Sequence, residues 1–459
     1  MRGSFTAWTR IAAIMMLTAA AAGCEPETQK IQPLNALPAD SAITLAVTTD
    51  LHYLSPDLQD SGSAFQRFLQ KGDGKRLEYS DPLTDAWVEE IRSARPDAVI
   101  LSGDLTNNGE LASHRKLAEK LGRIEAAGSR VYVIPGNHDI NNPWASGFRN
   151  DVQYRTEGVD PDEFRHIYAN FGYDEAVSRD KVTLSYLATP SASLWLLMLD
   201  TSQYDNNYRQ GYPQTDGELP ESTLKWIGKC ADEARRQGAR LLPVMHHNLL
   251  DHNSVIQKGY TLNNSREAVS LFSRIGVKAV FSGHIHIQDI STKAVQGNMI
   301  ADIASNALSV YPHQYGRVTV SKDGSFRYST VKLQVGRYAK QLGSRDDKLL
   351  QFETYSRERF MALSDRLYER AVSEDRSLAN LTQEEQQRLT KTMALLNLHY
   401  FAGTENTGAQ EIAGINGDKL LDTLHEGFLK NYLNGIRSDN TEDNELELQL
   451  PVVQVLPSD

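Results

Sequence analysis

Short apolar runs alternate with amphipathic stretches through the middle of the chain. The apolar runs are rich in Val, Ile and Leu and predict buried β-strands at Ile43–Thr48, Ala98–Leu101, Val131–Ile134, Leu194–Leu199, Leu241–Met245 and Lys278–Phe281. The amphipathic stretches predict helices at Asp81–Arg95, Ser113–Ala127, Asp160–Phe171, Glu221–Gln237 and Ser265–Ile275. Strands that alternate with helices in this way are typical of an α/β sandwich with a largely buried sheet.

The pattern changes further along the chain. Runs at Met299–Ile303, Gly316–Val320 and Ser325–Val335 predict antiparallel strands, with a hairpin turn at Lys322–Gly324. After about Arg337 we expect no more strands, because residues 345–435 follow a helical pattern almost throughout. The helices predicted there are Asp346–Val372, Gln383–Phe401 and Asp418–Leu433, and a capping box of Thr382 and Glu385 is predicted to start the second of them.

The first residues have the pattern of an export signal. Two arginines precede the apolar run Ile11–Ala22, which is too short to span a bilayer of ~30 Å as a helix. The following Ala-Ala-Gly-Cys resembles a bacterial lipoprotein cleavage box, so residues 1–23 are predicted to be a signal peptide and Cys24 the first mature residue. The alternative is a plain signal peptide followed by an unmodified cysteine. We expect an exported protein of the cell envelope, anchored to the membrane by a lipid on Cys24.

Composition divides the rest of the chain into further parts. Residues 25–40 are polar and contain several prolines, which predicts a flexible tether. The α/β pattern defines a domain over 41–337, and the helical pattern defines a second domain over 340–437. Residues 438–459 are acidic and are predicted to form a frayed tail.

Charge and cysteine content narrow the classes of function. The chain has 459 residues, a formal net charge of −11 and two cysteines. Lysine and arginine do not cluster, which disfavours binding to long nucleic acid, because that affinity comes from neutralising phosphates. A small anionic substrate remains compatible with this charge if a metal supplies the positive charge. A lipidated Cys24 would leave Cys230 without a disulfide partner, and we expect Cys230 to be a small buried residue of a helix.

Residues of types that commonly bind metals follow five of the predicted strands. They are Asp50 and His52, then Asp104, then Asn137, His138 and Asp139, then His246 and His247, and finally His284 and His286. Sites in α/β proteins form outside the carboxyl ends of the strands, so we expect these side chains to meet. Glycines at 103, 136 and 283 allow the sharp turns that this arrangement needs.

These residue types indicate a site for two metals. Two divalent ions held ~3.5–4 Å apart need a shared carboxylate and a set of oxygen and nitrogen ligands. Asp104 is the predicted bridge, because an aspartate on a tight turn faces both ions. The other expected ligands are Asp50, His52 and His286 for one metal and Asn137, His246 and His284 for the other. Imidazole mixed with carboxylate suits Mn, Fe, Zn or Co better than Mg or Ca.

Several positions leave alternatives open. Only one of the adjacent His246 and His247 should bind metal, because neighbours on a strand point in opposite directions. His138 stands next to a predicted ligand, where a cationic imidazole would stabilise or protonate a leaving oxygen; the alternative is a further metal ligand. The loop Asn141–Asp160 carries Trp144 and arginines that would suit a nucleotide, or it packs as a plain surface loop.

Polar residues outside the strand ends give weaker signals. Asn107, Asn108 and Glu110 are candidates for the rim of a pocket or for the cap of the next helix. Asp200 follows a predicted strand and would either orient a histidine ligand or form a turn.

Together the motifs resemble those of the calcineurin-like metallophosphoesterases, whose pattern is Asp-x-His, Gly-Asp, Gly-Asn-His-Asp/Glu, His and Gly-His-x-His. The chain contains every element in this order, and the resemblance covers about residues 43–320. The compact motifs resemble the bacterial cyclic-nucleotide phosphodiesterase branch, which includes secreted lipoproteins with appended helical domains. The resemblance implies a four-layer α/β/β/α sandwich, here followed by an all-helical C-terminal domain. The family's usual ligand position favours His246 over His247.

The resemblance also implies a mechanism. Two divalent metals, Mn, Fe or Zn, would hold a bridging hydroxide as nucleophile, His138 would assist the leaving group, and Asp139 would orient His138. We therefore expect hydrolysis of phosphodiesters, with cyclic nucleotides as candidate substrates. A phosphomonoesterase or nucleotidase is the near alternative, and an envelope binding protein on an inactive fold is the remote one. The expected partner is a small phosphate ester, with no long nucleic acid and no membrane contact beyond the lipid at Cys24.

Overall fold

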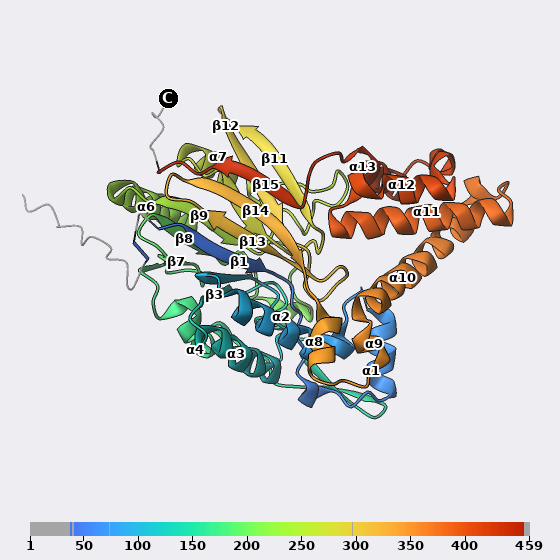
Figure 1. Cartoon of the computed structure of the whole chain (residues 1–459), viewed down its shortest axis with the longest axis horizontal. Helices are drawn as coiled ribbons and strands as arrows, with labels where there is room; N and C mark the ends of the chain where they lie inside the picture. The colour runs from blue at the N-terminus through green and yellow to red at the C-terminus, as the bar shows by residue number, and fades with distance from the viewer. Residues whose placement is uncertain (1–36, 39–40, 73, 296, 454–459) are drawn as a thin grey trace, which may run out of the picture. The chain divides into compact units, whose positions relative to one another are not determined.

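The computed structural model of the chain describes residues 37–38, 41–72, 74–295 and 297–453 (Figure 1). The predicted signal peptide, Cys24 and the tether up to residue 36 lie outside the described residues, and so do the last residues of the predicted tail. Among the helices of the described part, none is long and apolar enough to cross a bilayer.

A first mixed sheet combines strands from the start and the end of the domain. Within the described residues it has six strands, in the order β15-β14-β13-β1-β2-β3. They are β1 (Ile43–Thr48), β2 (Ala98–Ser102), β3 (Arg130–Ile134), β13 (Gln314–Val320), β14 (Ser325–Lys332) and β15 (Glu445–Gln449). Strands β1, β2 and β3 are parallel, whereas β13, β14 and β15 extend the sheet by antiparallel pairing.

A second mixed sheet, with seven strands in the described ranges, has the order β11-β12-β10-β9-β8-β7-β6. They are β6 (Ser178–Arg179), β7 (Tyr186–Ala188), β8 (Leu194–Leu199), β9 (Arg240–Met245), β10 (Ala279–Ser282), β11 (Asp289–Val295) and β12 (Asn298–Ala304). The predicted strand Met299–Ile303 is β12. It pairs antiparallel with β11, but it also pairs parallel with β10, which corrects the expectation of purely antiparallel pairing.

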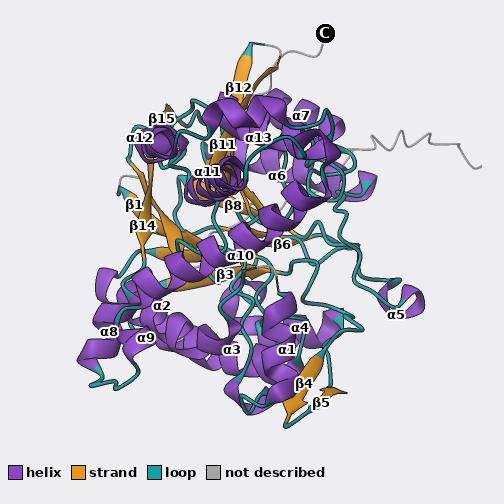
Figure 2. Ribbon diagram, turned by 90° about the vertical axis from the view of Figure 1, so that its right-hand side faces the viewer, coloured by secondary structure: helices purple, strands orange, loops and turns teal. Residues whose placement is uncertain are grey.

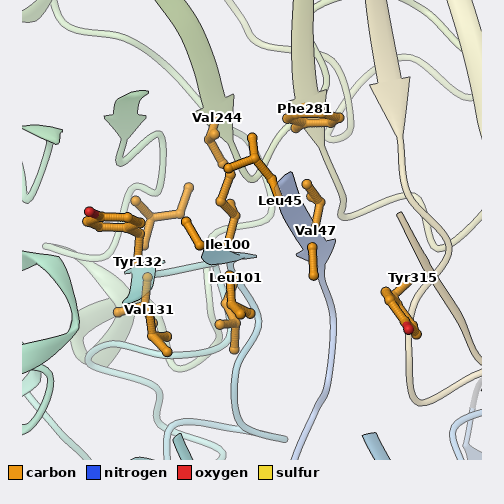
Figure 3. Close-up of a cluster of buried hydrophobic side chains, with 14 of the residues drawn as sticks. Leu45, Val47, Ile100, Leu101, Val131, Tyr132, Val244, Phe281 and Tyr315 are labelled. Atoms are coloured by element: carbon orange, nitrogen blue, oxygen red, sulfur yellow. The ribbon is translucent and has the colours of Figure 1, made fainter. Parts of the chain in front are cut away.

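The two sheets share one hydrophobic core (Figure 3). Leu45, Val47 and Ile100 of the first sheet are buried in the same cluster as Val244 and Phe281 of the second. The helices α2 (Ser80–Ala94) and α3 (Leu111–Glu125) cover the outer face of the first sheet, and α6 (Glu221–Gln237) and α7 (Ser265–Arg274) cover that of the second (Figure 1). This order of helix, sheet, sheet and helix confirms the predicted four-layer sandwich.

The α/β region also contains shorter elements. The helix α1 (Ser63–Lys71), which the pattern did not predict, packs against a hairpin of β4 (Ser146–Arg149) and β5 (Val152–Arg155) (Figure 2). The hairpin occupies the segment expected to be a long loop. The remaining elements are η1 (Pro56–Leu58), η2 (Leu77–Tyr79), α4 (Pro161–Ile167), the π-helical turn η3 (Ala169–Tyr173) and α5 (Asn207–Gln210).

The C-terminal region is helical, as predicted, with more breaks than the pattern indicated. Its elements are α8 (Val335–Gln341), α9 (Asp347–Leu350), α10 (Phe352–Glu374), η4 (Arg376–Leu378), α11 (Gln383–Ala402), α12 (Glu405–Ile415), η5 (Asp418–Thr423) and α13 (Phe428–Ser438). The capping box of Thr382 and Glu385 is present at the start of α11. The predicted helix Asp418–Leu433 is wrong as one element, because it is divided into η5 and α13.

The expected frayed tail contains a strand. Strand β15 pairs antiparallel with β14 over Ser325↔Gln449 to Ser329↔Glu445. Its side chains alternate, so Leu446 and Leu448 pack against the core while the acidic residues face outward. The expectation that strands end near Arg337 is therefore wrong, because β15 returns to the sheet after the helices.

The C-terminal helices share a hydrophobic cluster with the α/β region. Ile285 and Ile287, which follow β10, are buried in one cluster with Phe360 of α10 and Leu389 of α11. Residues close to the predicted metal ligands therefore rest directly on the helical region.

Candidate metal centre

The carboxyl ends of β1, β2, β3, β9 and β10 bring the predicted ligands into two clusters. One contains Asp50, His52, Asp104 and His286, and the other contains Asp104, His246 and His284. Within each cluster the ligand atoms all lie within 4.8 Å of one another. Asn137 joins the second cluster, since its Oδ1 lies 3.2 Å from His246 Nε2. The structure thus brings together all seven residues predicted as ligands; their binding of metal remains a prediction.

Asp104 belongs to both clusters through a single oxygen. Its Oδ2 lies 3.4 Å from His246 Nε2 and 3.7 Å from His52 Nε2. Its other oxygen, Oδ1, accepts the His138 backbone N–H at 2.8 Å, which fixes the orientation of the carboxylate. An oxygen that faces both donor sets is placed as a bridging ligand requires.

The first cluster contains a buried oxygen without a hydrogen-bond partner in the described part of the chain, which a bound metal would satisfy. Asp50 Oδ1 is buried and has no hydrogen-bond partner among the described residues. Yet it lies 3.2 Å from His286 Nε2 and 3.5 Å from His52 Nε2, and those two nitrogens are 3.1 Å apart. A buried carboxylate oxygen without a partner is costly, and a cation shared with the two imidazoles would satisfy it.

Backbone carbonyls orient the rings of the second cluster. The Nδ1–H of His246 donates to the Ser102 carbonyl at 2.9 Å, and the Nε2–H of His284 donates to the Gly259 carbonyl at 2.7 Å. These bonds leave Nε2 of His246 and Nδ1 of His284 as the ring nitrogens that a metal could use, as is usual for histidines that bind metals. Burial and the nearby charge of His246 lower the pKa of His284 to about 3, and burial and the charge of Lys75 lower that of His52 to about 3. Both rings are therefore neutral, the form that binds metal.

The carboxylates of the site are held in their charged form. Burial would raise the pKa of Asp50 and of Asp104, but His286 beside Asp50 and His246 beside Asp104 keep both pKa values well below the usual range. Burial would lower the pKa of His246, yet the charge of Asp104 raises it to about 9. A divalent cation at this position would replace the proton of His246.

The candidate ligands have unusual backbone conformations. Five of them have positive φ: Asp50 (51°), His52 (43°), Asp104 (48°), His284 (67°) and His286 (66°). A non-glycine residue in this region costs about 1–2 kcal/mol, and such strain is found mainly at functional sites. Close approach of the turns also requires glycine: a Cβ at Gly283 would lie 2.0 Å from Thr49 Oγ1, and one at Gly136 would lie 2.2 Å from Asp104 Oδ1.

The adjacent histidines have separate environments. His246 belongs to the second cluster, whereas His247 has Nδ1 at 2.7 Å from Thr201 Oγ1 and Nε2 at 3.0 Å from the Thr215 carbonyl. Both ring nitrogens of His247 are thus occupied by protein partners. The geometry agrees with the choice of His246 as the ligand.

His138 lies beside the clusters and is partly open to solvent. Its Nδ1–H donates to the Asn107 carbonyl at 2.8 Å, and the same nitrogen is 3.1 Å from Asn108 Oδ1. Its Nε2 is 4.0 Å from Asp104 Oδ2, and the side chain is 20% exposed. The ring therefore presents Nε2 toward the metal site from a position that a substrate can reach.

Asp139 acts on the main chain. Its carboxylate accepts backbone N–H groups from Gly136 at 2.8 Å, Leu105 at 3.0 Å and Thr106 at 2.9 Å. Burial and the charge of Asp104 raise the pKa of Asp139 to about 7. The implied role of Asp139 as the partner that orients His138 is corrected: Asp139 joins the turn after β2 to the turn after β3, and Asn107 holds the His138 ring.

The weaker candidates divide between the site and its scaffold. Asn107 and Asn108 contact His138, as the rim interpretation predicted, whereas Glu110 makes no side-chain cap for α3. Asp200 accepts the Ser202 N–H and the Tyr204 hydroxyl, so it forms a turn. Cys230 is buried in α6, as predicted.

Sequence reasoning missed Asn142, which is almost fully buried. Its Nδ2 donates to the His138 carbonyl at 2.9 Å, and its Oδ1 accepts the Trp144 N–H at 2.9 Å. The Asn142-Pro143 pair in the sequence was a signal for such a turn. A pocket of about 580 Å³ opens here, and His138 and Trp144 line it.

Two family models match the chain. The model of a family described as calcineurin-like phosphoesterase matches residues 43–288, more than half of the chain. Residues 334–443 match a second family, described as the C-terminal domain of cyclic nucleotide phosphodiesterase. The chain belongs to the calcineurin-like phosphoesterase family, whose members are metal-dependent hydrolases of phosphoesters.

Three similar proteins illustrate how far their sequences differ from this chain. A protein named "Probable cyclic nucleotide phosphodiesterase" from Ruthia magnifica subsp. Calyptogena magnifica is 22% identical over 202 residues, which cover 43% of this chain and 66% of that protein, just under two thirds. A dimetal phosphatase structure from Danio rerio has 14% identity and a TM-score of 0.42, covering 64% of this chain and 100% of that one. A structure titled "Putative 5'-Nucleotidase" from Staphylococcus aureus has 14% identity and a TM-score of 0.36, covering 61% and 51%. The family assignment rests on the sequence match.

Proposed function

We propose that the protein hydrolyses small phosphodiesters at a dinuclear metal site, and that cyclic nucleotides are among its substrates. The observation that carries the proposal is the Asp104 carboxylate, whose Oδ2 faces His52 in one donor cluster and His246 in the other. The preference for diesters is supported by the match of residues 334–443 to a domain described from cyclic nucleotide phosphodiesterase.

The proposed chemistry divides between the metals and His138. Two divalent ions, Mn, Fe or Zn, would be held by Asp50, His52, Asp104, Asn137, His246, His284 and His286. When bound they would neutralise phosphoryl charge and lower the pKa of water. His138 in its protonated form would donate Nδ1–H to the Asn107 carbonyl and Nε2–H to the ester oxygen. That oxygen leaves with the proton as its bond to phosphorus breaks and a water oxygen bonds to phosphorus in its place.

Phosphomonoester hydrolysis is the second candidate. The pocket beside His138 is also lined by Lys71 and Lys75. A monoester carries one more negative charge than a diester near neutral pH, and two cations beside the site would favour it.

The test is a comparison of two esters with the same leaving group. The full-length protein, purified with bound Mn²⁺, is assayed with bis-p-nitrophenyl phosphate and p-nitrophenyl phosphate, with a chelator-treated control. A higher kcat/KM for the diester supports the proposal, and a higher value for the monoester replaces it with a phosphatase. No turnover of either ester by protein with two bound metals would contradict both and favour a binding protein.

We also propose that the protein is exported and anchored to the membrane by a lipid on Cys24. The support is the basic start, the apolar run Ile11–Ala22 and the Ala-Ala-Gly-Cys sequence that ends at Cys24. Labelled palmitate should be incorporated into the expressed protein and not into Cys24→Ser; equal labelling of both would refute the anchor.

A further inference from the structure

We propose that the pocket beside His138 selects phosphoesters that carry a planar aromatic group of nucleobase size, and that Trp144 is the surface on which this group stacks. The inference rests on the proposed hydrolase function and names the class of its substrate. Its lining residues lie outside the metal clusters: Lys71 is on α1, Lys75 follows that helix, and Trp144 is in the loop that leads into β4.

The composition of the pocket suits an anionic aromatic ligand. Lys71, Lys75 and Trp144 line it together with His138, and its described lining residues include no aspartate or glutamate, although the chain has a net charge of −11. Its volume of about 580 Å³ is that of a site for a small organic ligand. Cationic groups attract the phosphate, and an aromatic wall suits a flat ring.

Trp144 has an unusual combination of exposure and fixation. Its side chain is 49% exposed, which leaves ring surface available to a ligand. Its indole N–H donates to the Gly211 carbonyl at 3.2 Å, and its backbone is bonded to Asn142 and to the hydroxyl of Ser146. A tryptophan held at both the ring and the backbone loses little conformational freedom when a ring stacks on it.

Asn142 links the backbone of Trp144 to the backbone of His138. Asn142 donates to the His138 carbonyl and accepts the Trp144 N–H, both at 2.9 Å. Asn142 is thus a positioning residue. It fixes the place of Trp144 relative to His138, the residue proposed to protonate the leaving oxygen. A ring on Trp144 would belong to the part of the ester that is attached next to His138.

The charged and aromatic walls are joined by packing. The ring centroid of Phe148, on β4, lies 5.3 Å from that of Phe65 and 4.8 Å from that of Phe68, and both of these residues are on α1. Lys71 is the last residue of the same helix. Phe65 and Phe148 are buried in one cluster and Phe68 packs against it, so the pocket is formed before the ligand binds.

The experiment compares Trp144→Ala and Trp144→Phe with the wild type, as full-length protein with Mn²⁺ bound. The substrates are adenosine 3',5'-cyclic phosphate and an aliphatic cyclic diester, glycerol 1,2-cyclic phosphate. We expect Trp144→Ala to raise KM for the nucleotide roughly ten- to a hundredfold, with little change in kcat and no change for the aliphatic ester. Trp144→Phe should retain most of the affinity. Phe428→Ala is the control, because Phe428 is 64% exposed but lies on α13, outside this pocket.

A binding measurement separates this inference from the proposed function. Isothermal titration of adenosine 5'-monophosphate and of glycerol phosphate into the metal-loaded protein needs no turnover. A Kd that rises in Trp144→Ala for the nucleotide alone supports the pocket even if neither diester is hydrolysed, an outcome that would count against the hydrolase proposal only. Equal losses for both ligands, or no loss for either, would overturn the assignment of Trp144.

Discussion

Asp104 is the residue on which both donor clusters depend. It is buried, it has positive φ, and its two oxygens have different tasks: Oδ1 accepts the His138 N–H, and Oδ2 faces the histidines of both clusters. The positive φ of Asp104 coincides with this double role, as is usual for strained residues at functional sites.

At the residue scale, His138→Ala should separate catalysis from metal binding. We expect both metals to stay bound, because the ring is held by Asn107 and lies outside both clusters. Turnover should fall on the order of 10²–10⁴-fold, most for esters with poor leaving groups, which need the proton. Rates on a series of phenyl esters of rising leaving-group pKa measure this effect. Loss of metal in the variant would instead make His138 a ligand.

Much of the site followed from the rule that ligands gather at the carboxyl ends of strands. This rule placed Asp50, Asp104 and His284 together because each directly follows a buried apolar run. It did not predict what holds the His138 ring or where Trp144 lies. Those depend on loop hydrogen bonds, such as the bridge through Asn142, that no periodicity records.

At the element scale, the buried strands were predicted closely and the edge elements were not. Strand β8 has apolar side chains on both faces, so its sequence alone marks it as a buried strand. Strand β15 has a half-polar sequence and pairs with β14, from which it is separated by the whole helical region. The local sequence pattern therefore cannot predict that β15 pairs with β14, although Leu446 and Leu448 alternate with charged or polar neighbours as in a strand.

Deletion of residues 340–459 should prevent folding. It removes β15 from its sheet and exposes Ile285 and Ile287. Each of these side chains would lose about 1.5–3 kcal/mol of the free energy that its burial contributes to folding. Soluble yield and a thermal unfolding curve measure the outcome, with Leu367→Ser as control, because that side chain is 62% exposed and should leave Tm unchanged. A truncated protein that unfolds cooperatively and hydrolyses a small ester would show that the helices are only a cover.

At the scale of the whole molecule, the site combines both sheets with the loops around them and rests on the C-terminal helices. The turns after strands of both sheets supply the donor clusters. The pocket is lined by residues of α1, of the β4–β5 hairpin and of the loops around His138 and Trp144. The C-terminal helices pack on the residues beside His284 and His286. The two family matches, over 43–288 and 334–443, follow one another along the same chain. A chain that is acidic overall therefore concentrates lysine and histidine where a phosphate ester would bind.

The central claim is that Asp104 holds two metals in one site, and a metal count per chain tests it most directly. Full-length protein and Asp104→Ala are loaded with Mn²⁺, freed of excess metal and measured by mass spectrometry, with circular dichroism to confirm that the variant is folded. We expect about two ions per wild-type chain and fewer than one in the variant. Two ions retained by Asp104→Ala, or a single ion in the wild type, would contradict the account.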